Sequence, residues 1–300
     1  MKVFRLATPE WTTILLFGLG LIGEAVSRAL QRRFQPETEV LAYDWLDATR
    51  RRADWLSVAQ SAGHSRHLVF LWCGGIEGFA SDPLAMARET AILAELIAHA
   101  ETFARDRRVD FHMMSSAGGL FEGQTQCVLS SDPAPLCPYG IAKLAQERHF
   151  AEATSLGRRL VYRPTSVYGT SPSRRAGLIS ALVANAMSGQ TTRISGSPHT
   201  LRDYVLADDI GEFVSRQILG TEASDVSALL LSSGRPSSIY EIIERVRELV
   251  PRPLFLQFDP SPSNGRNMSF LRSAFPTGWR PTELSNGISR VVTALRTTHA

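Results

Sequence analysis

Short apolar runs alternate with segments of helical periodicity over the first half of the chain. The first run begins at Ile14 and leads through a glycine cluster into a helical segment, Glu24–Arg32, and a second run covers Val40–Tyr43. The alternation continues with apolar runs at Leu68–Trp72, Phe111–Met114 and Leu160–Tyr162, and with helical segments at Leu84–Ala104 and Tyr139–Thr154. Strands that alternate with helices predict an α/β fold with a doubly wound parallel sheet.

The pattern changes after Gly169, where polar stretches rich in Pro, Gly and Ser become frequent. We therefore expect a first domain over residues 1–169, rejoined by roughly 203–233, and a smaller α/β substrate-binding domain over 170–202 and 234–300. The helical segment Leu84–Ala104 is apolar on more sides than one sheet contact requires, which predicts a homodimer.

The composition narrows the class of protein and of partner. Of 300 residues, 44% are hydrophobic and 20% are charged, as in ordinary globular proteins, and the net charge of +3 implies neither a nucleic-acid nor a membrane partner. The three cysteines have the spacing of neither a disulfide framework nor a metal site, which favours a reducing compartment. No apolar stretch reaches the roughly 20 residues of a membrane helix. We expect a cytoplasmic protein without a metal.

The glycine cluster has the pattern G-x-G-x-x-G between a predicted strand and a predicted helix. Glycines in this context allow a tight turn and let backbone N–H groups and the helix N-terminus approach a pyrophosphate. A glycine-rich turn without a ligand is the alternative. We predict that this loop binds a dinucleotide through Gly18, Gly20, Leu21, Ile22 and Gly23.

A carboxylate at the end of the second apolar run bears on the choice of cofactor. Asp44 stands 24 positions after Gly20, where it would accept hydrogen bonds from the adenosine ribose. It would repel a 2′-phosphate, so NAD is favoured over NADP. Arg50, Arg51 and Arg52 could compensate, but a solvated helix face is the preferred interpretation of these arginines. The predicted cofactor contacts also include Trp45, Cys73 and Gly74.

Tyr139 and Lys143 lie four residues apart in a segment patterned as a helix, so they share one face. Free tyrosine has a pKa of about 10 and needs a nearby cation to act as a base. Lys143 can supply that charge and can also bind the nicotinamide ribose. Ser116 follows an apolar run and could hold the reacting oxygen against Tyr139. Taken singly, Tyr139 and Lys143 could be an exposed pair on a helix, and Ser116 could be a turn residue. Taken together, and following the glycine loop in the sequence, the three residues predict a catalytic trio.

At this point the sequence resembles the extended short-chain dehydrogenase/reductase family, the NAD-dependent sugar epimerases and dehydratases. Six segments match in family order: Gly18–Gly23, Ser115–Ala117, Pro138–Lys143, Arg163 with Val167–Gly169, Arg202–Val205 with Asp208 and Asp209, and Gly278–Pro281. The resemblance implies a Rossmann domain that binds NAD and a C-terminal domain that binds a nucleotide sugar. It also implies catalysis by Ser116, Tyr139 and Lys143, with Arg202 on the substrate phosphates.

Other polar residues of the matching region have simpler alternatives. An ion pair with Asp203 is the alternative for Arg202, and we expect Asp208 or Asp209 to cap a helix over Ile210–Leu219. Ser166 and Arg266 are further predicted substrate contacts. Surface charge is an equally good interpretation of the basic residues of the second domain: Arg174, Arg175, Arg193 and Arg266.

Departures from the family pattern restrict the reaction. Family dehydratases carry an Asp-Glu pair after the catalytic hydroxyl residue, where this chain has Ala117 and Gly118. Decarboxylating relatives place an acid in this turn, and the epimerase-reductases that make fucose nucleotides have a cysteine there and a histidine at the position of Ser171. The chemistry that remains needs one acid/base group and a hydride carrier.

Further departures concern the cofactor side. Phe17 and Gly18 replace the family's usual glycine spacing, whereas Ser166 and Glu89 stand where asparagines are common. Only 23 residues separate Asp44 from Leu68, so we expect a shortened third strand and helix and a remodelled adenine pocket.

The sequence thus predicts an NAD-dependent nucleotide-sugar 4-epimerase that oxidises the sugar transiently at C4. One alternative is an NAD(P)H-dependent reductase of 4-keto nucleotide sugars. A second, from another class, is a dinucleotide-binding sensor or scaffold without turnover, because a fold alone never establishes activity.

Overall fold

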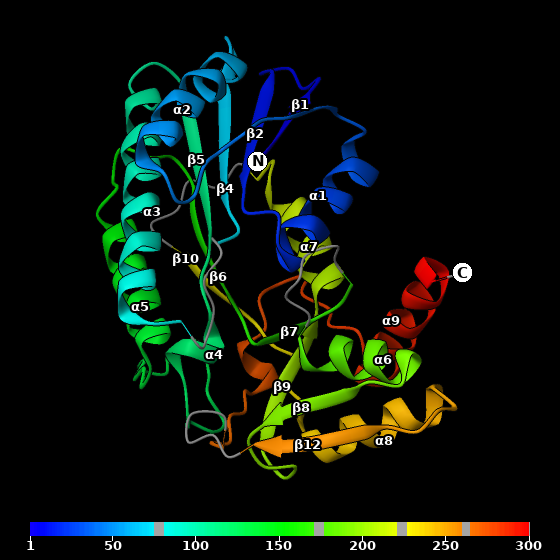
Figure 1. Cartoon of the computed structure of the whole chain (residues 1–300). Coiled ribbons are helices and arrows are strands. Elements are labelled where there is room, and N and C mark those ends of the chain that lie inside the picture. Colours follow the sequence, from blue (N-terminus) through cyan, green and yellow to red (C-terminus); the bar gives the residue numbers. More distant parts are fainter. Residues whose placement is uncertain (75–80, 171–176, 221–226, 260–264, 300) are drawn as a thin grey trace.

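The computed structural model describes residues 1–74, 81–170, 177–220, 227–259 and 265–299. Its main element is a seven-stranded sheet with the order β10-β6-β5-β4-β2-β1-β3 (Figure 1). The strands are β1 (Lys2–Leu6), β2 (Thr12–Phe17), β3 (Glu37–Val40), β4 (His67–Trp72), β5 (Arg108–Met114), β6 (Arg159–Pro164) and β10 (Ser227–Leu231). From β10 to β2 all neighbouring strands are parallel. The predicted α/β class and the parallel sheet are confirmed.

Helices cover both faces of this sheet (Figure 1). One face carries α2 (Ala48–Ala62), α3 (Pro83–Phe103) and α5 (Pro138–Ala151), and the other carries α1 (Leu21–Phe34) and α7 (Ala207–Gln217). Successive side chains of a strand point to opposite faces. In β4, Phe70 and Trp72 therefore enter the core under α2, α3 and α5, whereas Val69 and Leu71 enter the core under α1 and α7.

The N-terminal strand β1 changes one half of the sheet. It pairs antiparallel with β2 and with β3, and therefore separates the two strands that flank the glycine loop and α1. Strand β3, which follows α1, ends at Val40, so the strand expected at Val40–Tyr43 was placed too late in the sequence. Between Asp44 and β4 the chain forms only α2, and the expected third strand is missing from this fully described segment.

A second group of elements packs below the carboxyl end of the sheet (Figure 1). A three-stranded sheet contains β7 (Ser166–Tyr168), β9 (Leu201–Leu206) and β11 (Pro236–Ser238), and a two-stranded one contains β8 (Thr191–Ser195) and β12 (Phe255–Asp259). A separate apolar core joins them to α6 (Leu178–Ser188), α8 (Ile239–Leu249) and α9 (Leu284–His299). The short elements are α4 (Ala117–Leu120) and a 3-10 turn at Arg272–Ala274. Within the described ranges, no helix is long and apolar enough to cross a membrane. The division into two domains remains a prediction.

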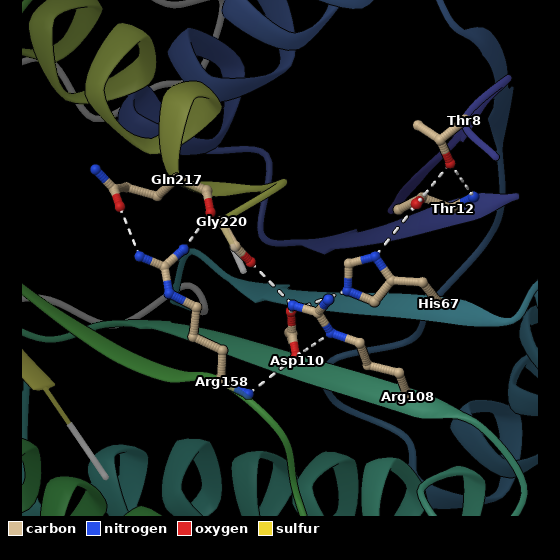
Figure 2. Close-up of polar contacts among 8 residues, drawn as sticks. All are labelled: Thr8, Thr12, His67, Arg108, Asp110, Arg158, Gln217 and Gly220. Carbon is tan, nitrogen blue, oxygen red and sulfur yellow. Dashed lines mark hydrogen bonds and ion pairs between the residues drawn. The ribbon is translucent and has the colours of Figure 1, made fainter. Parts of the chain in front are cut away.

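A buried polar network joins the amino ends of the parallel strands (Figure 2). The Asp110 carboxylate is fully buried and accepts hydrogen bonds from His67 Nε2 (2.9 Å), Arg108 Nη2 (2.7 Å) and the Arg158 backbone N–H (2.9 Å). Arg108 also donates to the Gly220 carbonyl at 2.9 Å, which anchors the chain after α7. The network therefore joins neighbouring strands at their amino ends, at the opposite end of the sheet from the carboxyl ends of the strands.

The two acidic residues at the start of α7 do not cap it. The helix begins after Leu206 without a side-chain cap, so the capping prediction was wrong. Asp209 accepts hydrogen bonds from Thr282 N (2.6 Å) and Thr282 Oγ1 (2.8 Å), and Asp208 lies 2.6 Å from Arg28 Nη2 of α1. Both carboxylates therefore bind α7 to distant parts of the chain.

Candidate active site

A cavity of about 340 Å³ lies at the carboxyl ends of β5 and β6, where loops of both parts of the molecule meet. Four residues from the predicted site line it: Ile22, Ser116, Tyr139 and Ser166. A fifth, Arg202, reaches it from β9. The remaining lining residues are Ser115, Gly118, Pro164, Thr165, Val167 and Met268. Residues from widely separated segments therefore meet where an α/β sheet ordinarily binds its ligands.

Ser116 occupies the first turn after β5. It is the N-cap of α4, and its Oγ accepts a hydrogen bond from the Gly119 backbone N–H at 3.1 Å. Because that bond uses a lone pair of the hydroxyl, the Ser116 proton is still available to a ligand oxygen. A serine at this position therefore combines a helix cap with a donor on the cavity wall.

Tyr139 lies in the first turn of α5, directly after Pro138 at the start of the helix. Helices α4 and α5 touch through their backbones here, because a Cβ on Gly140 would lie 2.1 Å from the Gly119 carbonyl oxygen. Only glycines allow this approach. It brings the half-buried Tyr139 to the same cavity wall as Ser116.

Lys143 lies one turn further along α5 and is buried behind Tyr139. Its Nζ is 5.6 Å from the centre of the Tyr139 ring and 2.8 Å from Glu89 Oε1 of α3. Burial opposes the charged form of Lys143, but Glu89 and Tyr139 outweigh it, so the pKa of Lys143 is raised. Lys143 is therefore an ammonium ion beside the tyrosine, although it is not among the residues that line the cavity.

The glycine loop turns tightly between β2 and α1. Gly18 has a φ of +89°, and a Cβ there would lie 2.0 Å from the Gly74 carbonyl oxygen. A Cβ on Gly23 would lie 1.8 Å from the Gly18 carbonyl oxygen, so a glycine at this position lets the first turn of α1 pack directly on the loop that follows β2. A Cβ on Gly20 would meet no atom within 4 Å. The loop thus leaves open space at Gly20, beside the N-terminus of α1, the position predicted for the pyrophosphate.

Cys73 and Gly74 follow β4 and form the neighbouring wall of the loop. The Cys73 Cβ lies 3.4 Å from where a Cβ on Gly23 would be. Burial raises the pKa of the Cys73 thiol to about 12, so it is a neutral group. The structure therefore brings these two residues against the predicted pyrophosphate site.

Asp44 lies beyond the glycine loop and is tied to its own turn. Its Oδ1 accepts hydrogen bonds from the backbone N–H groups of Leu46 and Asp47, both at 2.8 Å, and these bonds lower its pKa. The preceding Tyr43 packs edge-on against Phe17, 5.0 Å between ring centres, which keeps this turn next to the loop. Trp45 continues the aromatic contact from Tyr43 to Trp72.

One of the three arginines after Asp44 is not solvated. Arg51 is buried, and its guanidinium pairs with Glu95 of α3 through bonds of 2.7 and 3.1 Å. The prediction of a solvated face is therefore wrong for Arg51, whereas Arg50 and Arg52 are exposed. The pair fixes α2 to α3 where the third strand is missing.

Arg202 is the cationic group of the cavity. It is buried, burial lowers its pKa, and its guanidinium donates a hydrogen bond to the Arg266 carbonyl. Asp203 accepts hydrogen bonds from Thr165 Oγ1 (2.7 Å) and Ser233 (2.7 Å to N and 2.9 Å to Oγ). The Asp203 carboxylate thus binds Thr165 and Ser233, and these bonds do not support the alternative of an Arg202–Asp203 ion pair.

The other predicted basic residues are less well placed. The Arg266 side chain is exposed and is not part of the cavity lining, and Arg193 is exposed on β8. Arg174, Arg175 and Ser171 lie outside the described residues. The sequence reasoning missed Pro164, Thr165 and Met268. Pro164 and Thr165 directly precede the predicted Ser166, and Met268 lies two residues after the predicted Arg266. A larger cavity of about 480 Å³ between β11, α8 and α9 contains none of the predicted catalytic residues.

Comparison with known families agrees with this geometry. The model of the NAD dependent epimerase/dehydratase family matches residues 14–225. The chain belongs to this family. The match begins within β2 and includes the glycine loop, Ser116, Tyr139, Lys143 and Arg202. The resemblance to the extended short-chain dehydrogenases is thereby confirmed, and with it an NAD-dependent enzyme.

Individual members of the family resemble the chain over most of its length. UDP-glucose 4-epimerase of Mycolicibacterium smegmatis is 26% identical over 72% of this chain and 71% of its own. Among solved structures, the Thermus thermophilus UDP-glucose 4-epimerase complex with NAD has a TM-score of 0.76 at 18% identity, covering 94% of this chain and 98% of its own. UDP-glucuronic acid 4-epimerase of Bacillus cereus has a TM-score of 0.73 at 16% identity, covering 93% and 97%. The Rossmann-type epimerase fold therefore extends over nearly the whole chain.

Proposed function

We propose that this chain is a nucleotide-sugar epimerase that transiently oxidises its substrate at the sugar C4. The observation that carries the proposal is the single cavity wall formed by Ser116 and Tyr139, with Ile22 of the glycine-loop helix on the same cavity. This arrangement supports a sugar hydroxyl held between the two hydroxyl groups, close to a dinucleotide on the loop.

The proposed chemistry assigns one role to each of three residues. Tyr139 takes the proton of the 4-hydroxyl and later returns it, and Ser116 donates a hydrogen bond to the same oxygen. Lys143 supports the phenolate by its charge and is the predicted ligand of the nicotinamide ribose. NAD, when bound, supplies a reversible hydride acceptor, so the hydride that leaves C4 can return to the opposite face of the keto sugar.

The cavity supports oxidation and reduction without elimination of water. None of the described residues that line it is a carboxylate, and Gly118 stands where a dehydratase would need an acid. An elimination needs a second proton-transfer group, whereas an inversion at C4 needs only Tyr139. Epimerisation is thus favoured over dehydration.

The proposed substrate is a nucleoside diphosphate hexose. Arg202 offers a buried cation and Ser166 a hydroxyl in the same cavity. The two epimerases named above for their folds act on UDP-sugars according to their names, and we extend that substrate class to this chain. A homodimer and a cytoplasmic location remain part of the proposal.

The test is epimerisation of a panel of UDP-hexoses by purified protein, with NAD as the added cofactor and no added reductant. We expect each active sugar and its C4 epimer to approach the same equilibrium from either side. Tyr139→Phe should lower kcat by about a hundredfold to ten-thousandfold and leave NAD binding intact. The control Tyr240→Phe removes the hydroxyl of an exposed tyrosine on α8 and should leave kcat unchanged.

Two outcomes would replace the proposal. Turnover of a 4-keto sugar only with added NADPH would establish the reductase. Wild type and Tyr139→Phe that bind NAD equally and are equally inactive would favour the sensor or scaffold.

A further inference from the structure

A buried carboxylate lies directly behind the proposed acid/base pair. Glu89 of α3 and Lys143 of α5 are 4% and 3% exposed, and Glu89 Oε1 lies 2.8 Å from Lys143 Nζ. Two opposite charges removed from water in this way are stable only together, because each alone carries a large desolvation cost. The positive charge of Lys143 beside Tyr139 is therefore compensated by the negative charge of Glu89.

Hydrogen bonds fix the relative position of the two charges. The fully buried Gln146 accepts from Lys143 Nζ at 3.0 Å through its Oε1. Its Nε2 donates to Thr90 Oγ1 at 3.1 Å and lies 3.4 Å from Glu89 Oε1. Helices α3 and α5 thus hold the carboxylate and the ammonium in one geometry.

The other charges near Lys143 are largely balanced among themselves. Glu147, one turn further along α5, makes a two-bond pair with Arg163 of β6 at 3.0 and 2.6 Å. Tyr139 is the titratable group on the other side of Lys143, with its ring centre 5.6 Å from Nζ. On the cavity side, Tyr139 also shares its surroundings with the buried guanidinium of Arg202. The charge behind the Tyr139 ring therefore depends on whether Glu89 neutralises Lys143.

Taking the proposed role of Tyr139 as given, we propose that Glu89 is a positioning residue that compensates Lys143 and thereby keeps Tyr139 a neutral phenol to higher pH. The first half of the proposed turnover needs the phenolate, so the charge of Glu89 sets the pH range in which that half can begin. Glu89 acts through Lys143 and does not touch the substrate.

A purely structural role of the Glu89–Lys143 pair would have a different consequence from the proposed one. The same pair could simply join α3 to α5, in which case its loss would lower stability without changing the titration of Tyr139. Tyrosinate absorbance measured against pH separates these roles without any substrate. Subtracting the curve of the matching Tyr139→Phe protein isolates the signal of Tyr139.

The decisive variant is Glu89→Gln, which keeps the shape and an oxygen acceptor for Lys143 but removes the charge. Charges a few ångströms apart at an effective dielectric near 20 shift each other's titration by about one pH unit or more. We expect the midpoint of Tyr139 ionisation to fall by about that amount. Glu89→Asp withdraws the carboxylate by one methylene and should lower the midpoint less.

The control is Glu95→Gln on the same helix, whose carboxylate pairs with Arg51 and not with Lys143. It should leave the midpoint unchanged. An unchanged midpoint in Glu89→Gln, or in Glu89→Asp should the glutamine variant not fold, overturns the proposal. If no nucleotide sugar is turned over, the proposed function fails while the titration still decides the role of Glu89.

Discussion

Gly119 and Gly140 bring α4 and α5 into backbone contact directly beside the predicted catalytic hydroxyls. A Cβ on Gly140 would lie 2.1 Å from the Gly119 carbonyl oxygen, and one on Gly119 would lie 3.0 Å from the Tyr139 ring. Atoms at 2.1 Å overlap, so any side chain at position 140 forces the two helices apart. The separation of Ser116 from Tyr139 is therefore set by two glycines.

Gly140→Ala tests this contact. A glycine-to-alanine change inside a helix ordinarily stabilises a protein by about 1 kcal/mol. Here we expect a decrease in the free energy of unfolding of about 1–3 kcal/mol, because the new methyl overpacks the contact. We also expect kcat to fall by about tenfold or more through misplacement of Tyr139. Urea denaturation and steady-state kinetics measure the two effects.

Gly118→Ala is the matched control on α4. Its Cβ would lie 3.7 Å from Ser116 Oγ, which is ordinary van der Waals contact. We expect its free energy of unfolding to stay within about 0.5 kcal/mol of the wild type. Equal destabilisation of both variants would mean that the helix contact does not control the site.

The glycine loop allows binding and folding to be separated. Gly20→Ala adds a methyl where the protein has open space, so we expect normal stability but an NAD Kd raised by about tenfold or more through a clash with the pyrophosphate. Gly23→Ala places its Cβ 1.8 Å from the Gly18 carbonyl oxygen and should lower thermal stability as well. Calorimetric titration with NAD and thermal unfolding check both variants. Normal NAD affinity in Gly20→Ala would place the pyrophosphate elsewhere.

The sequence predicts those parts of the fold that local patterns determine. Strand β4 is fully buried and apolar from Leu68 to Trp72, so the strand and its place inside a parallel sheet follow directly. Strand β1 has the mixed sequence KVFRL, and its insertion between β2 and β3 is a choice of distant pairing partners. No local period encodes that choice.

The same limit applies to the site. The motifs identify Tyr139 and Lys143, but the pairing of Lys143 with Glu89 joins residues 54 positions apart on two helices. The cap predicted for Asp208 or Asp209 was wrong because the helix already begins at Ala207, and Asp209 instead binds Thr282, 73 positions away. Residue type and spacing thus suggest candidate catalytic groups, whereas packing decides which charges neutralise one another.

Asp110 makes stability depend on pH in the acid range. Burial alone would raise its pKa, but the hydrogen bonds from His67 and Arg108 outweigh burial and lower the pKa to about 2 from 3.8. A carboxyl group with a depressed folded-state pKa stabilises the protein above its unfolded value, and the contribution is lost as the pH falls through its folded value. We expect a loss of about 2 kcal/mol between pH 4 and pH 2 from this group.

Asp110→Asn should remove that dependence. At pH 7 we expect its free energy of unfolding to be about 2–4 kcal/mol lower, since Arg108 and His67 lose their charged partner. The difference from the wild type should shrink as the pH approaches 2. Turnover per folded molecule should not change, because the network lies at the amino ends of the strands (Figure 2). A constant difference across this pH range would exclude a titrating role for Asp110.

Asp44→Asn tests the preference for NAD over NADP. Asparagine keeps an oxygen for the N–H groups of Leu46 and Asp47, so the turn should persist while the charge that repels a 2′-phosphate is lost. We expect the ratio of the NADP Kd to the NAD Kd to fall by about tenfold. Asp47→Asn is the control. Asp47 is the N-cap of α2 and lies three residues after Asp44, so this variant removes an equal charge nearby and should leave the ratio unchanged. If both variants lower the ratio equally, the charge of the whole turn, rather than a contact between Asp44 and the ribose, selects the cofactor.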